Sequence, residues 1–220
     1  MMEQSIKKAK DWFSGGAALE EMQSYQDRLK LWETEAAAAF PAGARVLNIG
    51  CGTGREAFAL QVKGFRVTGV DISETAIEAA RGTAADRGIQ MNFLVTDGKS
   101  LPFEDAVFDA AIIWAQTFGL FHGEESQQEI LAQCRRVLRP GGLLSFSGHD
   151  REYQQAHAAQ FLQGRHFYPF AETDLYYESF TMDELSGAAE RAGFQVLACK
   201  RGLVYNEADG TILHCLCKKE

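Results

Sequence analysis

The sequence lacks the cysteine pattern of a disulfide framework or a zinc site. Its five cysteines are an odd number and include no Cys-x-x-Cys pair, whereas disulfide-rich domains use even sets and zinc sites use closely spaced pairs. We therefore expect no disulfide framework and no bound metal. Cys215 and Cys217 are expected to lie on one face of the last strand, as part of the core.

The sequence also lacks a long hydrophobic run. Its longest aliphatic and aromatic stretch, residues 110–115, is far shorter than the roughly 20 residues that a membrane-spanning helix needs. Residues 1–12, MMEQSIKKAKDW, do not contain the apolar segment of a secretory signal. We therefore expect a cytoplasmic protein without a membrane partner.

Positive charge is scarce. The chain has 22 Lys and Arg against 30 Asp and Glu, a net charge of −8 at pH 7, and no basic cluster. Because an acidic chain repels phosphate backbones, we expect no nucleic-acid partner. With 220 residues, of which 46% are hydrophobic and 24% charged, the chain has the length and composition of a single globular domain.

Strands and helices are expected to alternate through the middle of the chain. Apolar residues recur at spacings of three and four in the first segment, which predicts one helix over residues 17–40, with Met22, Tyr25, Leu29, Trp32 and Ala36 on its apolar face. Apolar runs predict five strands, at 45–49, 66–70, 91–96, 110–114 and 143–147. Helices are expected between them, ending near residue 63, over 73–88, and opened by the capping box of Ser126 and Glu129. This alternation predicts a parallel sheet with helices on both faces.

The last third of the chain follows a different pattern. Residues 149–180 are polar and aromatic, which predicts an inserted helix and loop. Thr181 and Glu184 form a capping box for a helix that ends near Gly193. Strands over 194–205 and 211–218 flank a turn that contains Asp-Gly, which is typical of a β-hairpin. We therefore predict seven strands, mostly parallel, of which the last two form an antiparallel hairpin.

A glycine-rich turn follows the first strand. Gly50, Gly52 and Gly54 alternate in VLNIGCGTG and open a helix. Glycine allows a sharp turn and lets a ligand approach the backbone N–H groups, and the helix N-terminus favours an anionic group. The pattern indicates a ligand site, with an ordinary strand-to-helix turn as the alternative.

Two acidic residues follow the next two strands. Asp71 is suited to accept hydrogen bonds from both hydroxyls of a ribose, or it caps the helix that begins near Ser73. Asp97 could accept from an exocyclic amine while the Gly98 N–H donates to a ring nitrogen, a pairing that reads the edge of adenine. The alternative for Asp97 and Gly98 is a solvated turn.

These residues resemble the class I S-adenosylmethionine-dependent methyltransferases, most closely the small-molecule enzymes of the ubiquinone and menaquinone biosynthesis type. The resemblance covers about residues 45–218 and rests on VLNIGCGTG (46–54), GVDIS (69–73), TDGKSLPFEDAVFDAAIIW (96–114) and LRPGGLL (138–144). It implies a three-layer Rossmann-like fold, S-adenosyl-L-methionine as cofactor and S-adenosyl-L-homocysteine as product. It also divides the single domain (1–220) into a helical lid (1–43), a cofactor-binding core (44–148), an inserted acceptor lid (149–180) and a C-terminal helix and hairpin (181–220).

The resemblance also implies roles for individual residues. Gly50, Cys51 and Gly52 would line the methionine part of the cofactor, Asp71 would hold the ribose hydroxyls, and Ile72 would pack against adenine. Asp97 and Gly98 would bind the adenine edge, and the backbone of Trp114 and Ala115 would face the methionine amine and the sulfonium. Asn48 departs from the family, which usually has Asp or Glu there, so we expect weaker attraction for the ammonium group.

Other nucleotide-binding and methyltransferase classes fit less well. A dinucleotide-binding G-x-G-x-x-G turn requires glycine where Arg55 stands, and no P-loop motif occurs. Trp114-Ala-Gln-Thr-Phe118 replaces the Pro-Pro-Tyr/Trp motif of DNA-amino methyltransferases, and no proline precedes a cysteine as in the cytosine-C5 enzymes.

The methyl acceptor is less well defined than the cofactor. His149 and His122 lie near the carboxyl ends of the strands and are candidate general bases, with solvated loop histidines as the alternative. In the two lid segments, Trp12, Tyr25 and Tyr168 are candidate pocket residues for a small, partly apolar acceptor such as a phenol, quinone precursor, amine or thiol. A non-catalytic sensor or partner subunit that binds the cofactor, and a protein methyltransferase, stay open as alternatives, as do a monomer and a homodimer.

Overall fold

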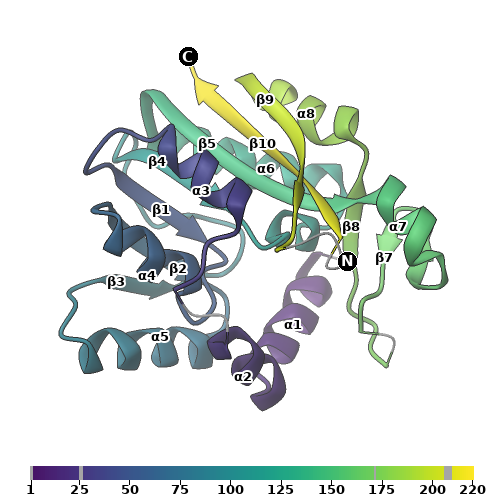
Figure 1. Cartoon of the computed structure of the whole chain (residues 1–220), viewed down its shortest axis with the longest axis horizontal. Coiled ribbons are helices and arrows are strands. Elements are labelled where there is room, and N and C mark those ends of the chain that lie inside the picture. The colour runs from purple at the N-terminus through teal and green to yellow at the C-terminus, as the bar shows by residue number, and fades with distance from the viewer. Residues whose placement is uncertain (1, 25–26, 171, 206–209) are drawn as a thin grey trace.

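Five parallel strands form the centre of the structure, a computed structural model that describes residues 2–24, 27–170, 172–205 and 210–220 (Figure 1). The strands are β1 (Arg45–Ile49), β2 (Arg66–Asp71), β3 (Asn92–Val95), β4 (Phe108–Ile113) and β5 (Leu138–Asp150). They lie in the order β3–β2–β1–β4–β5. The reversal of direction at β1 places the ends of β1 and β4 side by side, and ligands of such sheets bind at this point.

The predicted hairpin completes the sheet. β10 (Thr211–Lys219) lies antiparallel to β5 and to β9 (Phe194–Leu203), so seven strands run in the order β3–β2–β1–β4–β5–β10–β9. The tip of the hairpin, predicted as a turn with Asp-Gly, lies largely outside the described residues. The mostly parallel sheet with an antiparallel hairpin is confirmed, but the predicted count of seven strands is wrong, because three further strands within residues 162–180 extend the sheet to ten.

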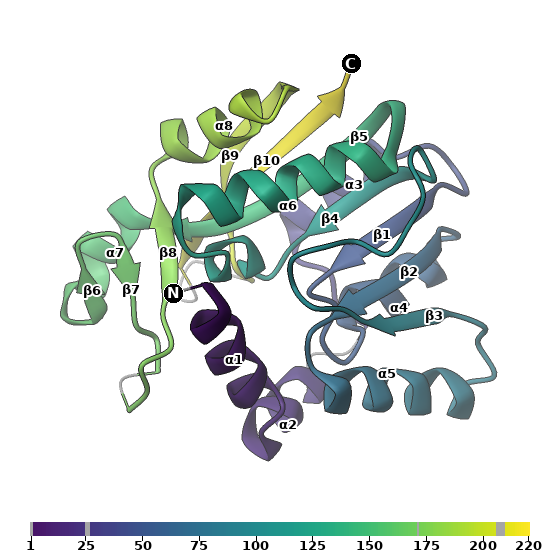
Figure 2. The same ribbon diagram turned by 180° about the vertical axis from the view of Figure 1, so that it is seen from behind.

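Helices cover both faces of the sheet and form the outer layers (Figures 1 and 2). On one face, α3 (Leu31–Ala38), α4 (Arg55–Val62) and α5 (Glu74–Asp86) pack around Val46, Phe58 and Ile77. On the other face, α6 (Gly123–Val137) and α8 (Met182–Arg191) pack around Leu131, Phe146 and Leu185. The sheet is thus buried on both sides, as the apolar runs of its strands predict.

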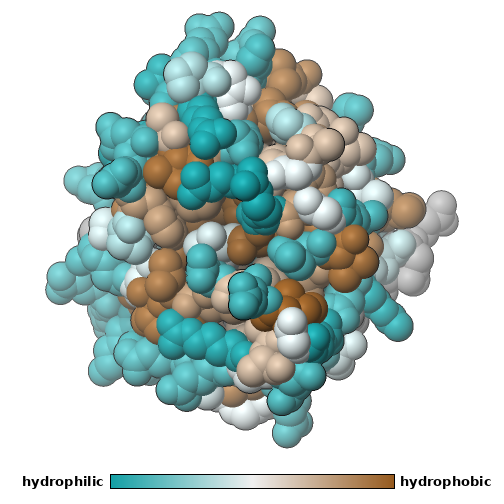
Figure 3. Space-filling model, turned by 90° about the vertical axis from the view of Figure 1, so that its left-hand side faces the viewer, coloured by the Kyte–Doolittle hydropathy of each residue, from teal (hydrophilic) through white to brown (hydrophobic). Residues whose placement is uncertain are grey.

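Two further helices lie across the carboxyl ends of the parallel strands. They are α1 (Met2–Phe13) and α2 (Gly16–Ser24), seen below the sheet in Figure 1. At the opposite edge, where the parallel strands begin, the surface mixes hydrophilic and hydrophobic side chains (Figure 3). Among the helices described, none is both long and apolar enough to cross a membrane.

The helix predicted over residues 17–40 is wrong, because α2 ends at Ser24 and α3 begins at Leu31. Met22 lies against the glycine turn, whereas Trp32 packs in the core against Gly202. Between the helices, the Arg55 guanidinium donates to the Arg28 carbonyl oxygen at 2.6 Å, and the Lys30 N–H donates to Glu33. The apolar spacing of three and four continues from one helix into the next, although the two helices face different parts of the protein.

The segment expected as an inserted helix and loop also contains strands. α7 (Arg151–His157) and a 3-10 turn (Ala159–Phe161) lead into β6 (Leu162–Gln163), β7 (His166–Phe167) and β8 (Tyr177–Phe180). β8 pairs in parallel with the end of β5, at His149–Ser179 and Asp150–Phe180. The insert is therefore an extension of the sheet.

Two element boundaries differ from those predicted. α6 begins at Gly123, and Ser126 of the predicted capping box is buried inside its first turn. β5 runs from Leu138 to Asp150 because the Arg-Pro-Gly-Gly segment forms a bulge opposite β4 within the strand.

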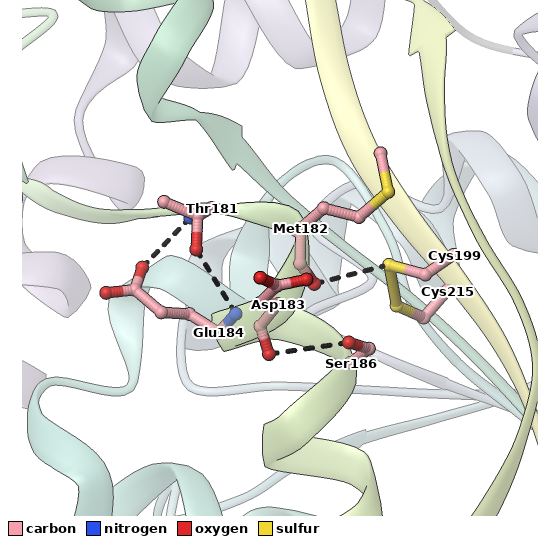
Figure 4. Close-up of a disulfide and its surroundings, with 7 residues drawn as sticks. All are labelled: Thr181, Met182, Asp183, Glu184, Ser186, Cys199 and Cys215. Atoms are coloured by element: carbon pink, nitrogen blue, oxygen red, sulfur yellow. Dashed lines mark hydrogen bonds between the residues drawn. A yellow bond between two sulfur atoms is a disulfide. The ribbon is translucent and has the colours of Figure 1, made fainter.

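Cys199 and Cys215 form a disulfide beside the first turn of α8 (Figure 4). The antiparallel register of β9 and β10 places the two residues opposite each other, so the prediction of no disulfide is wrong. The spacing of the cysteines along the chain contains no sign of this register. Cys215 and Cys217 are both fully buried, as predicted, and Cys217 is a free thiol.

Candidate functional site

The glycine turn after β1 has the backbone that glycine alone adopts easily. Gly50, Gly52 and Gly54 have φ angles of 70°, 51° and 96°. A Cβ at Gly52 would lie 2.8 Å from Met22 Sδ of α2, closer than real side-chain contacts. The turn therefore passes directly under α2, and α4 begins at the residue after Gly54.

Asp71 ends β2 beside this turn. Its Oδ2 accepts a hydrogen bond from the Gly52 N–H at 2.8 Å, and Oδ1 accepts one from the Ser73 N–H at 2.9 Å. Burial raises the pKa of this carboxyl, while the backbone donors oppose that rise. Ser73, whose hydroxyl accepts from the Ala76 N–H, is the residue that caps α5. Asp71 is therefore free of the capping role and retains lone pairs for a ligand.

Gly98 and Ile72 lie together at the ends of β3 and β2. A Cβ at Gly98, where φ is 73°, would lie 2.9 Å from Ile72 Cγ2. Asp97 is exposed, and its carboxylate accepts from the N–H groups of Lys99 and Ser100 at 2.8 Å each, as in the solvated turn that the sequence left open. These donors hold the pKa of Asp97 below its usual value.

One cavity of about 200 Å³ joins these features. Its floor comes from the carboxyl ends of the strands and includes Gly50, Gly52, Asp71, Ile72, Gly98 and Ala115. Its roof comes from α1 and α2 and consists of Ser5, Ile6, Ala9, Phe13 and Met22. The cavity is smaller than the roughly 300–1,000 Å³ of typical ligand pockets, which indicates that the roof lies close over the floor.

The chain turns sharply at the end of β4. Ala115 and Gln116 have φ angles of 51° and 60°, which residues other than glycine adopt at a cost and which are frequent at functional sites. The Trp114 indole is buried and donates to Ser145 Oγ at 2.8 Å, and the Gln116 N–H donates to Ser147 Oγ at 3.1 Å. Bonds to β5 thus fix the backbone where Ala115 meets the cavity.

Two amide groups near the same ends of β1 and β4 are unsatisfied. Asn48 Nδ2 and Gln116 Nε2 are buried and have no hydrogen-bond partner among the residues that the structure describes. The Cys51 side chain is also buried, and burial raises the pKa of its thiol well above the usual value. Asn48, Cys51 and Gln116 are not among the residues that line the cavity, so they border the site.

The two candidate histidines occupy different places. His149 lies within β5 rather than after it, and its ring contacts Phe167 and Tyr177 with centroids 4.9 Å apart in each case. Burial, with the charge of Lys30, lowers the pKa of His149 to about 3. Tyr177 lines the cavity, and so does His122, at the start of α6.

The candidate acceptor residues Trp12 and Tyr168 make aromatic contacts but are not among the residues that line the cavity. Trp12 of α1 packs on Phe170 of the insert, with ring centroids 4.5 Å apart, and its neighbour Phe13 lines the cavity. Tyr168 packs against Tyr176 at 5.4 Å. Tyr25 lies outside the described residues.

Several cavity residues were not identified from the sequence. Ile6, Ala9 and Phe13 line the roof, and their spacing of three and four is the signal of an apolar helix face that could have revealed them. Glu178, which is not among the cavity-lining residues, was also missed; it is buried and accepts from the Gly123 N–H at 2.8 Å and from Arg165 Nη2 at 2.8 Å. No local pattern in the sequence indicates these hydrogen bonds, because the partners of Glu178 lie elsewhere in the chain.

The strand order, the glycine turn, and the acids after β2 and β3 define a three-layer, Rossmann-like fold of the methyltransferase type. Residues 46–142 match the family described as "Methyltransferase domain". This match covers less than half of the chain, and it supports the resemblance of that part to the class I, S-adenosylmethionine-dependent methyltransferases.

Curated relatives and solved structures agree with this assignment. The chain is 37% identical over 102 residues to a demethylmenaquinone methyltransferase of Thermus thermophilus, which covers 46% of this chain and 44% of that protein. It is 30% identical over 147 residues to a ubiquinone biosynthesis O-methyltransferase of Coxiella burnetii, covering 66% and 60%. The chain thus spans about half the length of these relatives. A crystal structure of a SAM-dependent methyltransferase from Methanosarcina mazei has the same fold, with a TM-score of 0.74, 24% identity, and 87% and 99% coverage.

Proposed function

We propose that this protein transfers a methyl group from S-adenosylmethionine to a small-molecule acceptor. The observation that carries the proposal is the single cavity that joins the glycine turn, Asp71 and Gly98 under the roof of α1 and α2. A carboxylate, a glycine turn in the cavity wall and an apolar slot are the groups that a ribose, an amino acid and a purine require.

Named residues of this chain fit the cofactor. Asp71 would accept from the ribose hydroxyls, and Ile72 and Gly98 would hold the adenine, with Asp97 at the rim. Gly50, Gly52 and Ala115 would approach the methionine part, and Asn48, which stands where the family usually has an acid, would attract its ammonium group less strongly. When bound, S-adenosylmethionine supplies an electrophilic methyl group. The protein's task is then to position the acceptor and exclude water.

The N-terminal segment (1–43) and the insert (149–180) are proposed as lids. Three ion pairs join α1 to other elements: Glu3 with Lys99 at 3.1 Å, Lys8 with Asp174 at 3.0 Å, and Lys10 with Glu74 at 3.3 Å. Residues of α1 form the roof of a cavity that is small for a nucleoside. We therefore propose that α1 moves outward to admit the cofactor and closes over it.

The acceptor is proposed to be small and partly apolar. Phe13, Met22, Leu120, Phe121 and Tyr177 supply apolar side chains to the cavity wall, which also contains His122 and the charged Lys99 and Glu129. The relatives named for quinone biosynthesis support this class of molecule. The net charge of −8 supports an acceptor other than nucleic acid. A cytoplasmic location, and a monomer or homodimer, stay predictions.

Calorimetric titration with S-adenosylmethionine, S-adenosylhomocysteine and NADH tests the cofactor. We expect both sulfur nucleosides to bind and NADH not to bind. The Asp71→Ala substitution should lower the affinity for both nucleosides. Asp109→Ala is the matched control, because Asp109 also accepts a backbone N–H, that of Arg45 at 2.8 Å, but at the beginning of β4. Loss of binding in both variants would mean that the effect comes from folding.

Label transfer from S-adenosylmethionine to a panel of phenols, amines and thiols separates an enzyme from a binding protein. Turnover of a small acceptor supports the proposal. Tight nucleoside binding without turnover of any acceptor would favour the sensor or partner subunit. Labelling of proteins in a cell extract, with none of the small molecules, would favour a protein methyltransferase.

A further inference from the structure

The bridge between Cys199 and Cys215 lies at one edge of the sheet. Among the described strands, β9 pairs only with β10, so the sheet ends at the strand that carries Cys199. Cys199 is half-buried, whereas Cys215 is fully buried and lies opposite Phe146 of β5. A reagent that enters from solvent therefore meets Cys199 before Cys215.

The same surroundings also suit the reduced pair. The Cys199 sulfur lies 3.8 Å from the carbonyl oxygen of Met182, the first residue of α8 (Figure 4). A bridged sulfur has no hydrogen to donate to this oxygen, but a thiol has one. Cys215 packs in the apolar core, where a neutral thiol is also at home. Reduction therefore buries no polar group without a partner.

The strand that carries Cys199 also holds the start of the insert. Arg201, two residues further along β9, donates from Nε to Asp150 Oδ2 at 2.6 Å and from Nη2 to Glu152. Asp150 is fully buried, and its Oδ1 caps α7 by accepting from the N–H groups of Glu152 and Tyr153. Among the described residues, Arg201 is the only ion-pair partner of Asp150. Because a buried charge without a partner is costly, Asp150 depends on the position of β9.

The end of the insert lies beside the bridge as well. Phe180, the last residue of β8, is paired with Asp150 of β5. Met182, two residues further on, is the residue whose carbonyl oxygen faces Cys199. Both ends of the insert therefore meet the bridged part of the hairpin. Tyr177, at the start of β8, lines the cavity, so β8 connects this region to the candidate site.

We propose that Cys199 and Cys215 form a thiol–disulfide switch that sets how firmly the insert (149–180) is held over the cavity. The inference rests on the proposed function, because it treats the insert as a lid. The bridge joins residues 16 apart in sequence and so removes many conformations of the opened hairpin. In the bridged chain β9 stays in register and Arg201 stays on Asp150. In the reduced chain the edge strand opens more often and releases Asp150.

The switch needs a dithiol reductant from solution. A reductant thiolate bonds to the Cys199 sulfur as the bridge breaks, and the Cys215 sulfur keeps that electron pair and takes a proton. The second reductant thiolate then bonds to the first reductant sulfur, and the Cys199 sulfur keeps its electron pair and takes a proton. The protein gains two electrons and two protons, and the reductant becomes a cyclic disulfide.

Hydrogen–deuterium exchange of the wild type with and without dithiothreitol tests the switch. Cys51, Cys134 and Cys217 are already free thiols, so the bridge is the group that the reductant changes. We expect reduction to speed exchange of the β9 and α7 amides by about 10- to 100-fold, as a loop of this length implies. Exchange in β1, at the centre of the sheet, should change by less than about twofold, because global unfolding controls it.

Variants separate the role of the bridge from that of Arg201. Cys199→Ser should exchange like the reduced wild type with or without dithiothreitol, because serine can donate to the Met182 carbonyl oxygen but cannot form the bridge. Arg201→Gln should speed exchange in α7 even in the bridged chain. Lys200→Gln is the matched control, because Lys200 is the exposed neighbour of Arg201 on β9 and makes no ion pair with a described residue. It should exchange like the wild type.

Calorimetry with S-adenosylhomocysteine in both redox states measures the effect on the cavity, and we expect about fivefold weaker binding to the reduced chain. Equal α7 exchange in the two states, equal nucleoside affinity, a β1 change as large as that in α7, or a purified chain without the bridge would overturn the inference. The exchange measurement needs no ligand. A chain that binds no S-adenosylhomocysteine in either state, but shows the expected exchange, would therefore overturn the proposed function and the link to the cavity, and not the hold of the bridge on the insert.

Discussion

The Asp71 carboxylate is bonded to the Gly52 N–H, 2.8 Å away, and so joins the end of β2 to the turn after β1. Its second oxygen accepts from the Ser73 N–H at 2.9 Å. One side chain therefore fixes the positions of the glycine turn and of the start of α5. A residue proposed to bind the ribose also shapes the surface on which the rest of the cofactor would lie.

Asp71→Asn is expected to weaken both ligand binding and folding. The amide presents an N–H₂ group to one of the two backbone donors, which should lower the free energy of unfolding by about 1–3 kcal/mol. Loss of the charged acceptor for the ribose should reduce S-adenosylhomocysteine affinity by about tenfold or more. Urea denaturation and calorimetry measure the two effects. If Asp109→Asn reduces affinity equally, the ribose role of Asp71 is wrong.

The ion pairs of α1 predict that high salt opens the lid. The pairs of Lys8 and Lys10 are exposed, and each exposed pair contributes about 0.2–1 kcal/mol, which salt screens. S-adenosylhomocysteine should dissociate about fivefold faster at high salt, on the sum of these two pairs. Stopped-flow dissociation rates check this.

Variants separate lid opening from a general effect of salt. Lys8→Gln with Lys10→Gln should raise the dissociation rate at low salt and reduce its dependence on salt. Arg191→Gln is the control, because Arg191 makes an exposed pair with Glu124 between α8 and α6. If the wild type, the double variant and Arg191→Gln respond identically to salt, α1 is not the lid that opens.

Acid is expected to destabilise the fold through His149. The pKa of its ring is about 3 in the folded chain and about 6.5 in the unfolded one, so the unfolded chain binds the proton first as pH falls. Stability should therefore be lost as pH drops below about 6.5, by at most about 2 kcal/mol between pH 7 and pH 5. His149→Gln should remove this part of the loss. The urea midpoint is measured across the pH range in both proteins. If it falls with pH equally in the wild type and in His149→Gln, the prediction is wrong.

The structure predicts how many cysteine thiols react with a thiol reagent in the native and in the unfolded chain. Cys51, Cys134 and Cys217 are free and buried, and burial raises the pKa of Cys134 and of Cys217 to about 12. The native chain should therefore react very slowly with a thiol reagent. The unfolded, unreduced chain should expose three thiols, because Cys199 and Cys215 are bonded. Five thiols under those conditions would mean that the bridge does not form.

The features that could be predicted from the sequence are those with a local cause. The apolar runs predict the strands from β1 to β5. Gly50 and Gly52 predict a sharp turn, because glycine adopts the positive φ angles found there. The capping box of Thr181 and Glu184 is confirmed because its donors lie within one turn.

The features that could not be predicted depend on distant partners. One apolar period served both Met22, which reaches the cavity, and Trp32, which enters the core. The bond between Cys199 and Cys215 depends on strand register. His122 became distinguishable from His149 only when Tyr176 and Tyr177 of the insert were placed beside them.

The position of β10 between β5 and β9 has a consequence for the order of assembly on the ribosome. β9 is synthesised before β10, yet it has no place in the sheet until β10 has paired with β5 along residues 143–149. The five parallel strands, with the glycine turn and Asp71, precede both in the chain. The half proposed to bind the nucleoside can therefore form while one edge of β5 is still open, and synthesis of β10 closes that edge.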